Sequence, residues 1–311
     1  MSLPRVITDG PLSPDLDRML HGHVELLPWS AADADRDDSV CGIYTYGHPT
    51  VDHQMIDRLP NLRVISNNGV GVDHIDVAAA RQRNVAVGNT PGVLDGATAD
   101  MAFALILAAG RRIVESDRLA RAEDFDVQRP QVLMAHEVHG ATIGIVGLGQ
   151  IGGQVARRAL GFDMRVLYYN RREIVDGDIA ATYASLDRLL AESDYVVLTV
   201  PLSSSTTGMI GTREIELMKS TAVLVNVARG PVVDTAALTR ALQEGKIRGA
   251  GLDVTDPEPL PRDHPLLSQS NAVITPHLGS ATFETRRKMA ELSVENLLAG
   301  LRGDTLTTPV N

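Results

Sequence analysis

Three polar side chains, each placed shortly after an apolar stretch, form the set in this chain that is best suited to chemistry. They are Arg229, Glu258 and His277. The stretches that precede them are Val223–Asn226, Ala250–Asp253 and Ala272–Ile274. Strands of one parallel sheet end at a common edge, and such sheets bind ligands outside the carboxyl ends of their strands. We therefore expect the three side chains to converge at that edge.

This set suits the reduction of a carbonyl group. Imidazole titrates near neutral pH, so His277 is the expected general acid that protonates the alkoxide left by hydride addition. A carboxylate beside the ring favours the imidazolium, which is the role expected for Glu258. Arg229 presents a planar fork to a substrate carboxylate and has donors left to polarise the keto oxygen. Each residue alone has a plainer structural explanation, but together they predict a 2-keto acid substrate contacted by Arg229 and His277.

A glycine-rich turn upstream predicts the source of the hydride. The stretch Thr142–Val146 runs into Gly147-Leu-Gly-Gln-Ile-Gly152, and a helical pattern follows. A GxGxxG turn between a strand and a helix is typical of dinucleotide binding. In that motif Gly147 permits the tight turn, Gly149 lets a pyrophosphate approach and Gly152 lets the helix pack closely. The N–H groups expected at the start of the helix are those of Gln150 and Ile151.

The end of the next predicted strand, Arg165–Tyr169, indicates which dinucleotide is preferred. A carboxylate usually stands there and binds the ribose 2′-hydroxyl. Here the neutral Asn170 is followed by Arg171 and Arg172. Two guanidinium groups suit a 2′-phosphate, so we predict NADPH over NADH. If the arginines are ordinary exposed loop residues, either cofactor would serve.

Apolar strands alternate with helical patterns through almost the whole chain, which is typical of βαβ units and a parallel sheet. The first series of predicted strands is Arg5–Thr8, Val24–Leu27, Gly42–Tyr44, Arg63–Ser66 and Val85–Gly88. A long helix is predicted over Ala97–Arg121, and an irregular segment over Asp124–His139. The second series is Thr142–Val146, Arg165–Tyr169, Tyr195–Thr199, Val223–Asn226, Ala250–Asp253 and Ala272–Ile274, before a final helix over Thr282–Ala299. Two series predict an α/β protein of two doubly wound lobes, with the site in the cleft between them.

Length and composition narrow the class further. A chain of 311 residues predicts two domains. Its net charge of −10 disfavours nucleic acid as a partner. The single cysteine, Cys41, fits a reducing compartment, and the longest apolar run, Met101–Ala109, is too short to span a bilayer. The first ten residues lack a signal-peptide pattern. We therefore expect a cytoplasmic protein without a membrane partner, and the histidine spacing predicts no metal site.

The chain resembles the D-isomer-specific 2-hydroxyacid dehydrogenases over about residues 60–300. The resemblance rests on Asn68-Gly-Val-Gly-Val-Asp73, Asn89-Thr-Pro-Gly-Val93, the glycine-rich turn, Asn226-Val-Ala-Arg-Gly230, Gly249-Ala-Gly-Leu-Asp-Val254 and Thr275-Pro-His-Leu-Gly-Ser-Ala-Thr282. Leu252–Leu260 and Asn296–Gly303 look most like glyoxylate/hydroxypyruvate reductases. The resemblance implies a Rossmann cofactor domain of residues 97–282, inserted into a flavodoxin-like substrate domain of residues 1–96 and 283–311.

The resemblance also implies roles for matching positions. Arg229, Glu258 and His277 match the family's catalytic trio, and the backbone N–H groups of Val70 and Gly71 match its substrate-carboxylate site. The loop Tyr44–Gly47, with Tyr46, is expected to face the substrate. The further cofactor contacts are Thr98 near the phosphates, Val200, Pro201 and Thr206 at the adenine, and Val227, Ala228, Asp253 and Gly279 at the nicotinamide end. The family is typically a homodimer built around its cofactor domains, with the Ala97–Arg121 helix in the contact.

The sequence leaves three readings of function. The leading one is an NADPH-preferring reductase of glyoxylate or hydroxypyruvate, and the second is a reductase of bulkier 2-keto acids. Tyr44, Tyr46 and the segment Asp124–His139, which lacks the tryptophans of many relatives, would decide between them through pocket volume. The third is a dinucleotide-sensing binding protein of the same fold. Turnover of a 2-keto acid separates the third from the other two.

Overall fold

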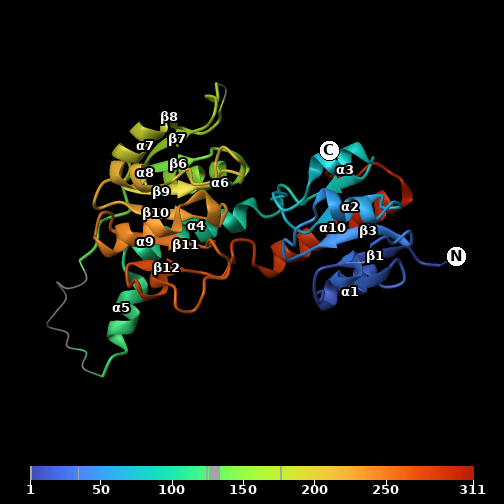
Figure 1. Cartoon of the computed structure of the whole chain (residues 1–311). Helices are drawn as coiled ribbons and strands as arrows, with labels where there is room; N and C mark the ends of the chain where they lie inside the picture. The colour runs from blue at the N-terminus through green and yellow to red at the C-terminus, as the bar shows by residue number, and fades with distance from the viewer. Residues whose placement is uncertain (1, 34, 124, 126–133, 176) are drawn as a thin grey trace. The chain divides into compact units, whose positions relative to one another are not determined.

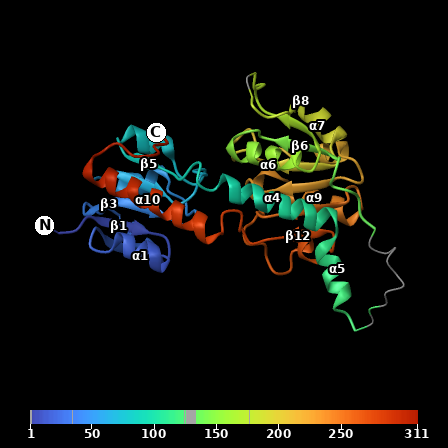
Figure 2. The same cartoon turned by 180° about the vertical axis from the view of Figure 1, so that it is seen from behind.

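The chain forms two compact units in the computed structural model, which describes residues 2–33, 35–123, 125, 134–175 and 177–311. One unit is Met1–Leu94 together with Ala281–Asn311, and the other is Asp95–Ser280 (Figures 1 and 2). These boundaries lie two residues from those expected at 96/97 and 282/283. The chain leaves the first unit after residue 94 and returns to it at residue 281, so the second unit is an insertion.

The first unit is built on a parallel sheet of five strands in the order β2-β1-β3-β4-β5. This is the strand order of flavodoxin-like folds. The strands are β1 (Arg5–Thr8), β2 (Glu25–Pro28), β3 (Val40–Thr45), β4 (Val64–Asn67) and β5 (Ala86–Gly88). All five were expected from the sequence, with ends that differ by two residues at most.

Helices cover both faces of this sheet, each over its own apolar cluster. The helices α1 (Pro14–Leu20) and α10 (Phe283–Arg302) pack on one face, and α2 (His53–Arg58) and α3 (Val77–Gln82) on the other. The final helix runs three residues past the predicted end at Ala299 and stops at Gly303, whose φ of 81° suits glycine.

The second unit has a parallel sheet of seven strands in the order β12-β11-β10-β9-β6-β7-β8. Counted within the unit this is 7-6-5-4-1-2-3, which contains the Rossmann order. The strands are β6 (Thr142–Val146), β7 (Arg165–Tyr169), β8 (Thr182–Tyr183), β9 (Tyr195–Leu198), β10 (Val223–Asn226), β11 (Gly249–Leu252) and β12 (Ala272–Ile274). All but β8 were expected, and the predicted α/β class of two doubly wound parallel sheets is confirmed.

This sheet also has an apolar cluster on each face. The helices α4 (Asp95–Gly110) and α6 (Gln150–Leu160) pack against each other on one side. The other side carries α7 (Leu186–Glu192), α8 (Thr212–Leu217) and α9 (Thr235–Gln243). Both faces are therefore buried, as a parallel sheet requires.

The single long helix expected over Ala97–Arg121 is wrong. The chain forms α4 and then α5 (Ile113–Ala120), and the break falls at Arg112, whose φ of 54° is left-handed. The side chain of Arg112 forms an ion pair with Glu115, which lies in the first turn of α5. None of the residues of α5 is buried, and the helix extends beyond the sheet of its own unit (Figure 2). Residues 124 and 126–133 of the predicted irregular segment lie outside the described residues.

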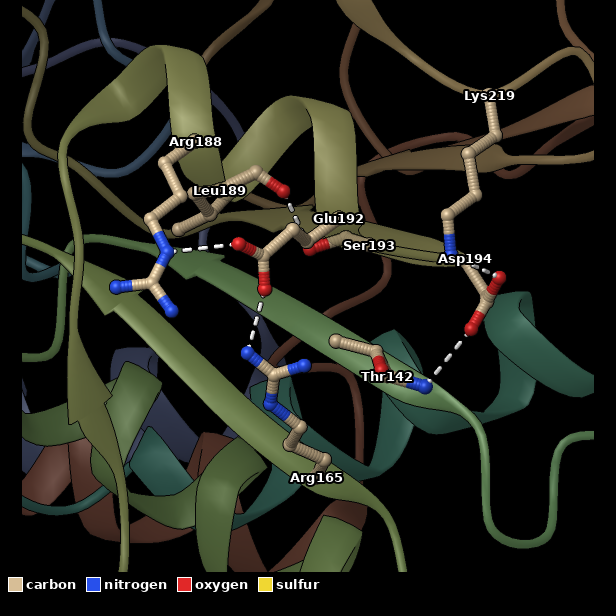
Figure 3. Close-up of polar contacts among 8 residues, drawn as sticks. All are labelled: Thr142, Arg165, Arg188, Leu189, Glu192, Ser193, Asp194 and Lys219. Carbon is tan, nitrogen blue, oxygen red and sulfur yellow. Dashed lines mark hydrogen bonds and ion pairs between the residues drawn. The ribbon is translucent and has the colours of Figure 1, made fainter.

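Charged side chains tie the amino ends of three strands of the second sheet together (Figure 3). Glu192, at the end of α7, accepts hydrogen bonds from Arg188 at 2.7 Å and from Arg165 of β7 at 2.5 Å. The carboxylate of Asp194 accepts from the N–H of Thr142 at 2.9 Å and from Lys219 at 2.7 Å. These contacts lie at the edge opposite the glycine-rich turn and link the starts of β6, β7 and β9.

No helix in the described part of the chain has the length and apolar character that a membrane span needs.

Candidate active site

Strand register brings the predicted site residues of the second unit to one edge of its sheet. Asn226 pairs with Leu252, and Leu252 pairs with Ile274, so the loops that follow β10, β11 and β12 leave side by side. Leu198 pairs with both Asn226 and Val146, which places the glycine-rich turn at the same edge. Arg229, Glu258 and His277 therefore share the carboxyl edge with that turn, as the sequence led us to expect.

The imidazole of His277 is bound directly to the carboxylate of Glu258. His277 Nδ1 lies 2.7 Å from Glu258 Oε1, and the two side chains are 31% and 41% exposed. The other oxygen, Oε2, accepts from the N–H of Thr255 at 3.3 Å, within the loop that carries Glu258. This contact fixes the orientation of the imidazole ring.

A buried carboxylate shapes the turn that carries His277. Asp253 is 3% exposed, and its oxygens accept from Thr275 Oγ1 at 2.6 Å and from the N–H groups of Leu278 at 2.8 Å and Gly279 at 2.7 Å. The N–H of His277 donates to the carbonyl of Asp253 at 2.9 Å. These bonds hold His277 at a φ of 55°, a left-handed conformation that is uncommon for a residue with a Cβ.

A buried amide side chain, that of Asn226, shapes the loop that carries Arg229. Asn226 is 1% exposed, and its side chain donates to the carbonyl of Arg229 at 2.9 Å and accepts from the N–H of Ala228 at 3.0 Å. The neighbouring Gly230 packs directly on the loop of Glu258, since a Cβ there would lie 1.9 Å from the carbonyl oxygen of Thr255. The loop of Arg229 and the loop of Glu258 are thus in contact through backbone.

The glycine-rich turn has the shape that a pyrophosphate needs. Gly147 has a φ of 104°, and a Cβ on Gly152 would lie 2.2 Å from the carbonyl oxygen of Gly147. A Cβ on Gly149 would meet no atom within 4 Å, so the space beside it is open. Gly149 is also the N-cap of α6 and provides no side-chain cap. The N–H groups in the first turn, which include those of Gln150 and Ile151, can therefore bind an anion.

The end of β7 carries no carboxylate. Asn170 instead uses its side-chain oxygen to accept from the N–H of Leu148 in the glycine-rich turn at 2.7 Å. Arg171 and Arg172, which follow it, are exposed, and neither forms an ion pair with any residue that the structure describes. Two guanidinium groups are thus accessible at this corner of the sheet.

The other residues expected at the cofactor lie around the same edge. Thr206 Oγ1 donates to the carbonyl of Pro201 at 2.7 Å and so closes the loop after β9, next to Val200. Val227 and Ala228 are 7% and 8% exposed. Thr98, in α4, lies beside Gly279, where a Cβ would meet its methyl group at 3.4 Å. Thr98 is therefore next to the His277 turn.

In the first unit, the loop after β4 presents backbone N–H groups. Asn67, 1% exposed, donates to the carbonyls of Gly69 at 3.0 Å and Gly71 at 2.9 Å, and Asn89 donates to the carbonyl of Val70 at 2.8 Å. Within the described residues, the N–H groups of Val70 and Gly71 have no acceptor. These two adjacent N–H groups, called the N–H nest below, are backbone donors that an anion could accept from.

The expectation that both tyrosines of the loop Tyr44–Gly47 face the substrate is wrong for Tyr44. Its side chain is fully buried in β3, its hydroxyl lies 2.8 Å from Ser293 Oγ of α10, and burial raises its pKa. Tyr46 follows the end of the strand and is half-buried, and Asp9 accepts from its N–H at 2.7 Å. Only Tyr46 remains available at the edge of the sheet.

Asn226, Asn67, Thr275 and Gly230 were given no role of their own from the sequence, although all but Asn67 lie in the motifs that carry the resemblance. Asn226 and Asn67 end strands, but nothing in the sequence shows that their amides turn back onto the chain. A search of the described residues finds no cluster of His, Cys, Asp or Glu that could hold a metal ion.

Residues 103–279 match the model of a family described as "D-isomer specific 2-hydroxyacid dehydrogenase, NAD binding domain". A glyoxylate reductase of Korarchaeum cryptofilum is 49% identical over 84% of this chain and 80% of its own length. Another, of Thermococcus onnurineus, is 41% identical over 99% of this chain and 96% of its own length. A crystal structure of the NADPH-dependent glyoxylate/hydroxypyruvate reductase of Sinorhizobium meliloti with NADP and malonate has a TM-score of 0.88 and 32% identity, covering 99% of this chain and 97% of that one.

Proposed function

Since this chain belongs to the D-isomer-specific 2-hydroxyacid dehydrogenases, we propose that it reduces small 2-keto acids, glyoxylate or hydroxypyruvate, to D-2-hydroxy acids. The observation that carries the proposal is the 2.7 Å contact between His277 and Glu258, at the sheet edge shared with the glycine-rich turn. The names of the similar reductases support the choice of substrates.

The residues of the second unit divide the reaction between them. A reduced nicotinamide dinucleotide, held by the glycine-rich turn and the first turn of α6, would supply the hydride for the keto carbon. His277 gives a proton to the keto oxygen from Nε2, while Glu258 stabilises the charged ring through Nδ1. Arg229 binds the substrate carboxylate and polarises the keto oxygen, which lowers the energy of the developing alkoxide. Hydride on carbon and proton on oxygen together give the hydroxy acid.

In the first unit, the N–H nest of Val70 and Gly71 is the proposed binding site for the substrate carboxylate. Two N–H groups with no acceptor among the described residues suit a small anion, and Asn67 and Asn89 keep the carbonyls of the loop away from it. Tyr46, at the neighbouring strand end, is proposed to border the substrate.

The cofactor is proposed to be NADPH rather than NADH. Gly147, Gly149 and Gly152, with the first turn of α6, would hold the pyrophosphate. Arg171 and Arg172 would bind the negatively charged 2′-phosphate. Asn170 is neutral and does not repel this phosphate. The NADPH-dependent relative supports this choice. The remaining proposed contacts are Gln150, Ile151, Thr98, Val200, Pro201, Thr206, Val227, Ala228, Asp253 and Gly279.

The active form is proposed to be a homodimer, with α5 in the contact. Among the residues of α5, Ile113 is 51% exposed and Leu119 is 36% exposed, and none of the eight is buried. A helix with exposed apolar residues gains stability when a second surface covers them.

The test is a panel of 2-keto acids, from glyoxylate to branched and aromatic ones, assayed with NADPH and with NADH. We expect the highest kcat/KM with glyoxylate or hydroxypyruvate and NADPH.

Replacing Arg171 and Arg172 by Gln should lower kcat/KM for NADPH about ten-fold or more and leave NADH unaffected, because one charge-assisted bond contributes roughly 1.5–3 kcal/mol. Faster reduction of bulky substrates, or a preference for NADH, would contradict these assignments. Binding of NADPH without turnover of any 2-keto acid would indicate a sensor.

A further inference from the structure

The first turn of helix α10 carries an arginine, Arg286, that lies over the aromatic ring of Tyr46 in the same unit. Arg286, at the end of the first turn, is half-buried and holds its guanidinium carbon 6.0 Å from the centre of the Tyr46 ring. The adjacent Arg287 is exposed and donates to Glu291 at 2.9 Å. Across the part of the chain that the structure describes, Arg286 pairs with no carboxylate. Its donors are thus available for a ligand.

The position of Arg286 on the helix directs it toward the sheet of its unit. Ser293, seven residues later, lies on the same helix face, because two turns separate them. Ser293 is fully buried, lies 2.8 Å from the hydroxyl of Tyr44 in β3 and accepts from Ser66 of β4 through its carbonyl at 2.7 Å. Tyr46 follows Tyr44 along the chain while Arg286 precedes Ser293, so α10 runs antiparallel to the strands. Its first turn therefore lies at their carboxyl edge.

The N–H nest belongs to the same edge. Thr45, which precedes Tyr46, pairs in register with Asn67, and Thr45 Oγ1 donates to Asn67 Oδ1 at 2.9 Å. The amide of Asn67 then orders the loop of Val70 and Gly71. One strand pair thus carries both the nest and the aromatic ring on which Arg286 rests.

Resting on the proposed function, we propose that Arg286 determines specificity for the substituent on C3 of the substrate. With the substrate carboxylate in the nest, the guanidinium donates hydrogen bonds to an oxygen carried by C3. The favoured class is 2-keto acids with an oxygen acceptor at that position, either a hydroxyl, as in hydroxypyruvate, or a carboxylate, as in ketomalonate. Pyruvate has the same carbon skeleton without the acceptor, and glyoxylate has no C3.

The test compares kcat/KM for these four substrates in the wild-type enzyme and in Arg286→Gln, with Arg287→Gln as the matched control. Arg286→Gln should lower kcat/KM at least ten-fold for hydroxypyruvate, ketomalonate or both, because it removes a bond to a charged group. Pyruvate and glyoxylate should change little, and Arg287→Gln should leave all four unchanged. A loss confined to hydroxypyruvate assigns the oxygen to a hydroxyl, and a loss confined to ketomalonate assigns it to a carboxylate.

An equal loss for all four substrates, or no loss for any, would overturn the proposal. If Arg286→Gln does not fold, Arg286→Lys keeps the charge but loses the planar fork and should show the same substrate pattern with a smaller loss. Calorimetric binding of D-glycerate and D-lactate gives a readout without turnover. If the oxygen is a hydroxyl, the wild-type preference for D-glycerate should disappear in the variant, and a preference that persists would count against Arg286 as its donor. A wild-type enzyme that reduces none of the four would instead refute the proposed function.

Discussion

Several contacts to the backbone of its loop position the guanidinium group of Arg229. Asn226 fixes the carbonyl of Arg229 from one side, and Gly230 presses the same loop against the loop of Glu258. The side chain itself donates from Nη1 to the carbonyl of Ala228 at 2.9 Å. Such a preorganised fork loses little entropy when it binds a carboxylate.

We predict that Arg229→Ala lowers kcat and raises KM together, because the carboxylate and the developing alkoxide both lose a partner. Each effect should be about ten-fold or larger, since hydrogen bonds to charged groups contribute roughly 1.5–3 kcal/mol. Steady-state kinetics with glyoxylate and hydroxypyruvate measure both constants. Arg229→Lys, which keeps the charge but not the fork, should recover only part of the loss. Unchanged constants in Arg229→Ala would remove this residue from the proposed mechanism.

At the scale of single residues, the candidate reactive side chains are easier to predict from the sequence than the side chains that position them. Arg229, Glu258 and His277 stand out as a set, because each follows a different apolar strand of one predicted sheet within a few residues. Asp253 also follows a strand, and it was expected at the nicotinamide, but its carboxylate bonds to the backbone around His277. That use depends on the left-handed turn at His277, which no residue type in the segment signals.

At the scale of an element, two glycines of the glycine-rich turn distinguish the proposed role in binding from a role in folding. At Gly149 an added Cβ would touch nothing in the chain, whereas at Gly152 it would overlap the carbonyl oxygen of Gly147. We predict that Gly149→Ala keeps the wild-type free energy of unfolding and weakens binding of the dinucleotide. Gly152→Ala should weaken binding and also lower the free energy of unfolding by about 1–3 kcal/mol, as overpacking does.

Chemical denaturation and fluorescence titration with NADPH measure the two properties in each variant. Unaltered NADPH affinity in Gly149→Ala would mean that no phosphate approaches this backbone. Equal stability of Gly152→Ala and the wild type would mean that α6 can shift without penalty.

The network at the amino edge of the Rossmann sheet predicts a dependence of stability on pH. Hydrogen bonds from Arg188 and then Arg165 lower the pKa of Glu192 below its ordinary value. A carboxylate with a lowered pKa in the folded state stabilises the protein above its unfolded pKa, and the stabilisation is lost as the pH falls through the folded pKa. Glu192→Gln should therefore be less stable than the wild type at pH 7 and equally stable in acid.

Urea unfolding at pH 7 and in acid, below the lowered pKa of Glu192 in the folded protein, measures this difference. Glu216→Gln, an exposed glutamate of α8, is the matched control and should show no pH-dependent difference. A stability gap for Glu192→Gln that stays constant over this range would contradict the electrostatic account.

The elements were predictable where periodicity and length were sufficient. Four- and five-residue apolar strands such as β6 and β10 were found at their observed bounds. The two residues of β8 are too few to show a pattern. The break between α4 and α5 was missed because the left-handed residue is Arg112 rather than a glycine or proline.

At the scale of the whole molecule, α5 provides the test of assembly. Ile113→Glu with Leu119→Glu should convert the dimer to a monomer, because charged groups cannot be buried without partners. Arg118→Glu, exposed on the same helix, is the control and should remain dimeric. Light scattering distinguishes 33.4 kDa from twice that mass. A wild-type protein that is monomeric at assay concentrations would refute the proposed dimer.

Much of the organisation of the whole chain could be predicted, because the strand and helix patterns and the sequence motifs indicate the same fold. The two βαβ series gave the two sheets, and the motifs placed the catalytic candidates on the second. The proposed specificity for the substrate could not be predicted in the same way, because Tyr46 and Arg286 are far apart in the sequence and meet only after folding.

The most direct test of the central claim is the rate of hydride transfer to hydroxypyruvate in His277→Ala, measured together with its affinity for NADPH. The account predicts that kcat falls by about 10²–10⁴, the usual contribution of a general acid, while NADPH binds as in the wild type. A variant that reduces hydroxypyruvate at the wild-type rate would contradict it.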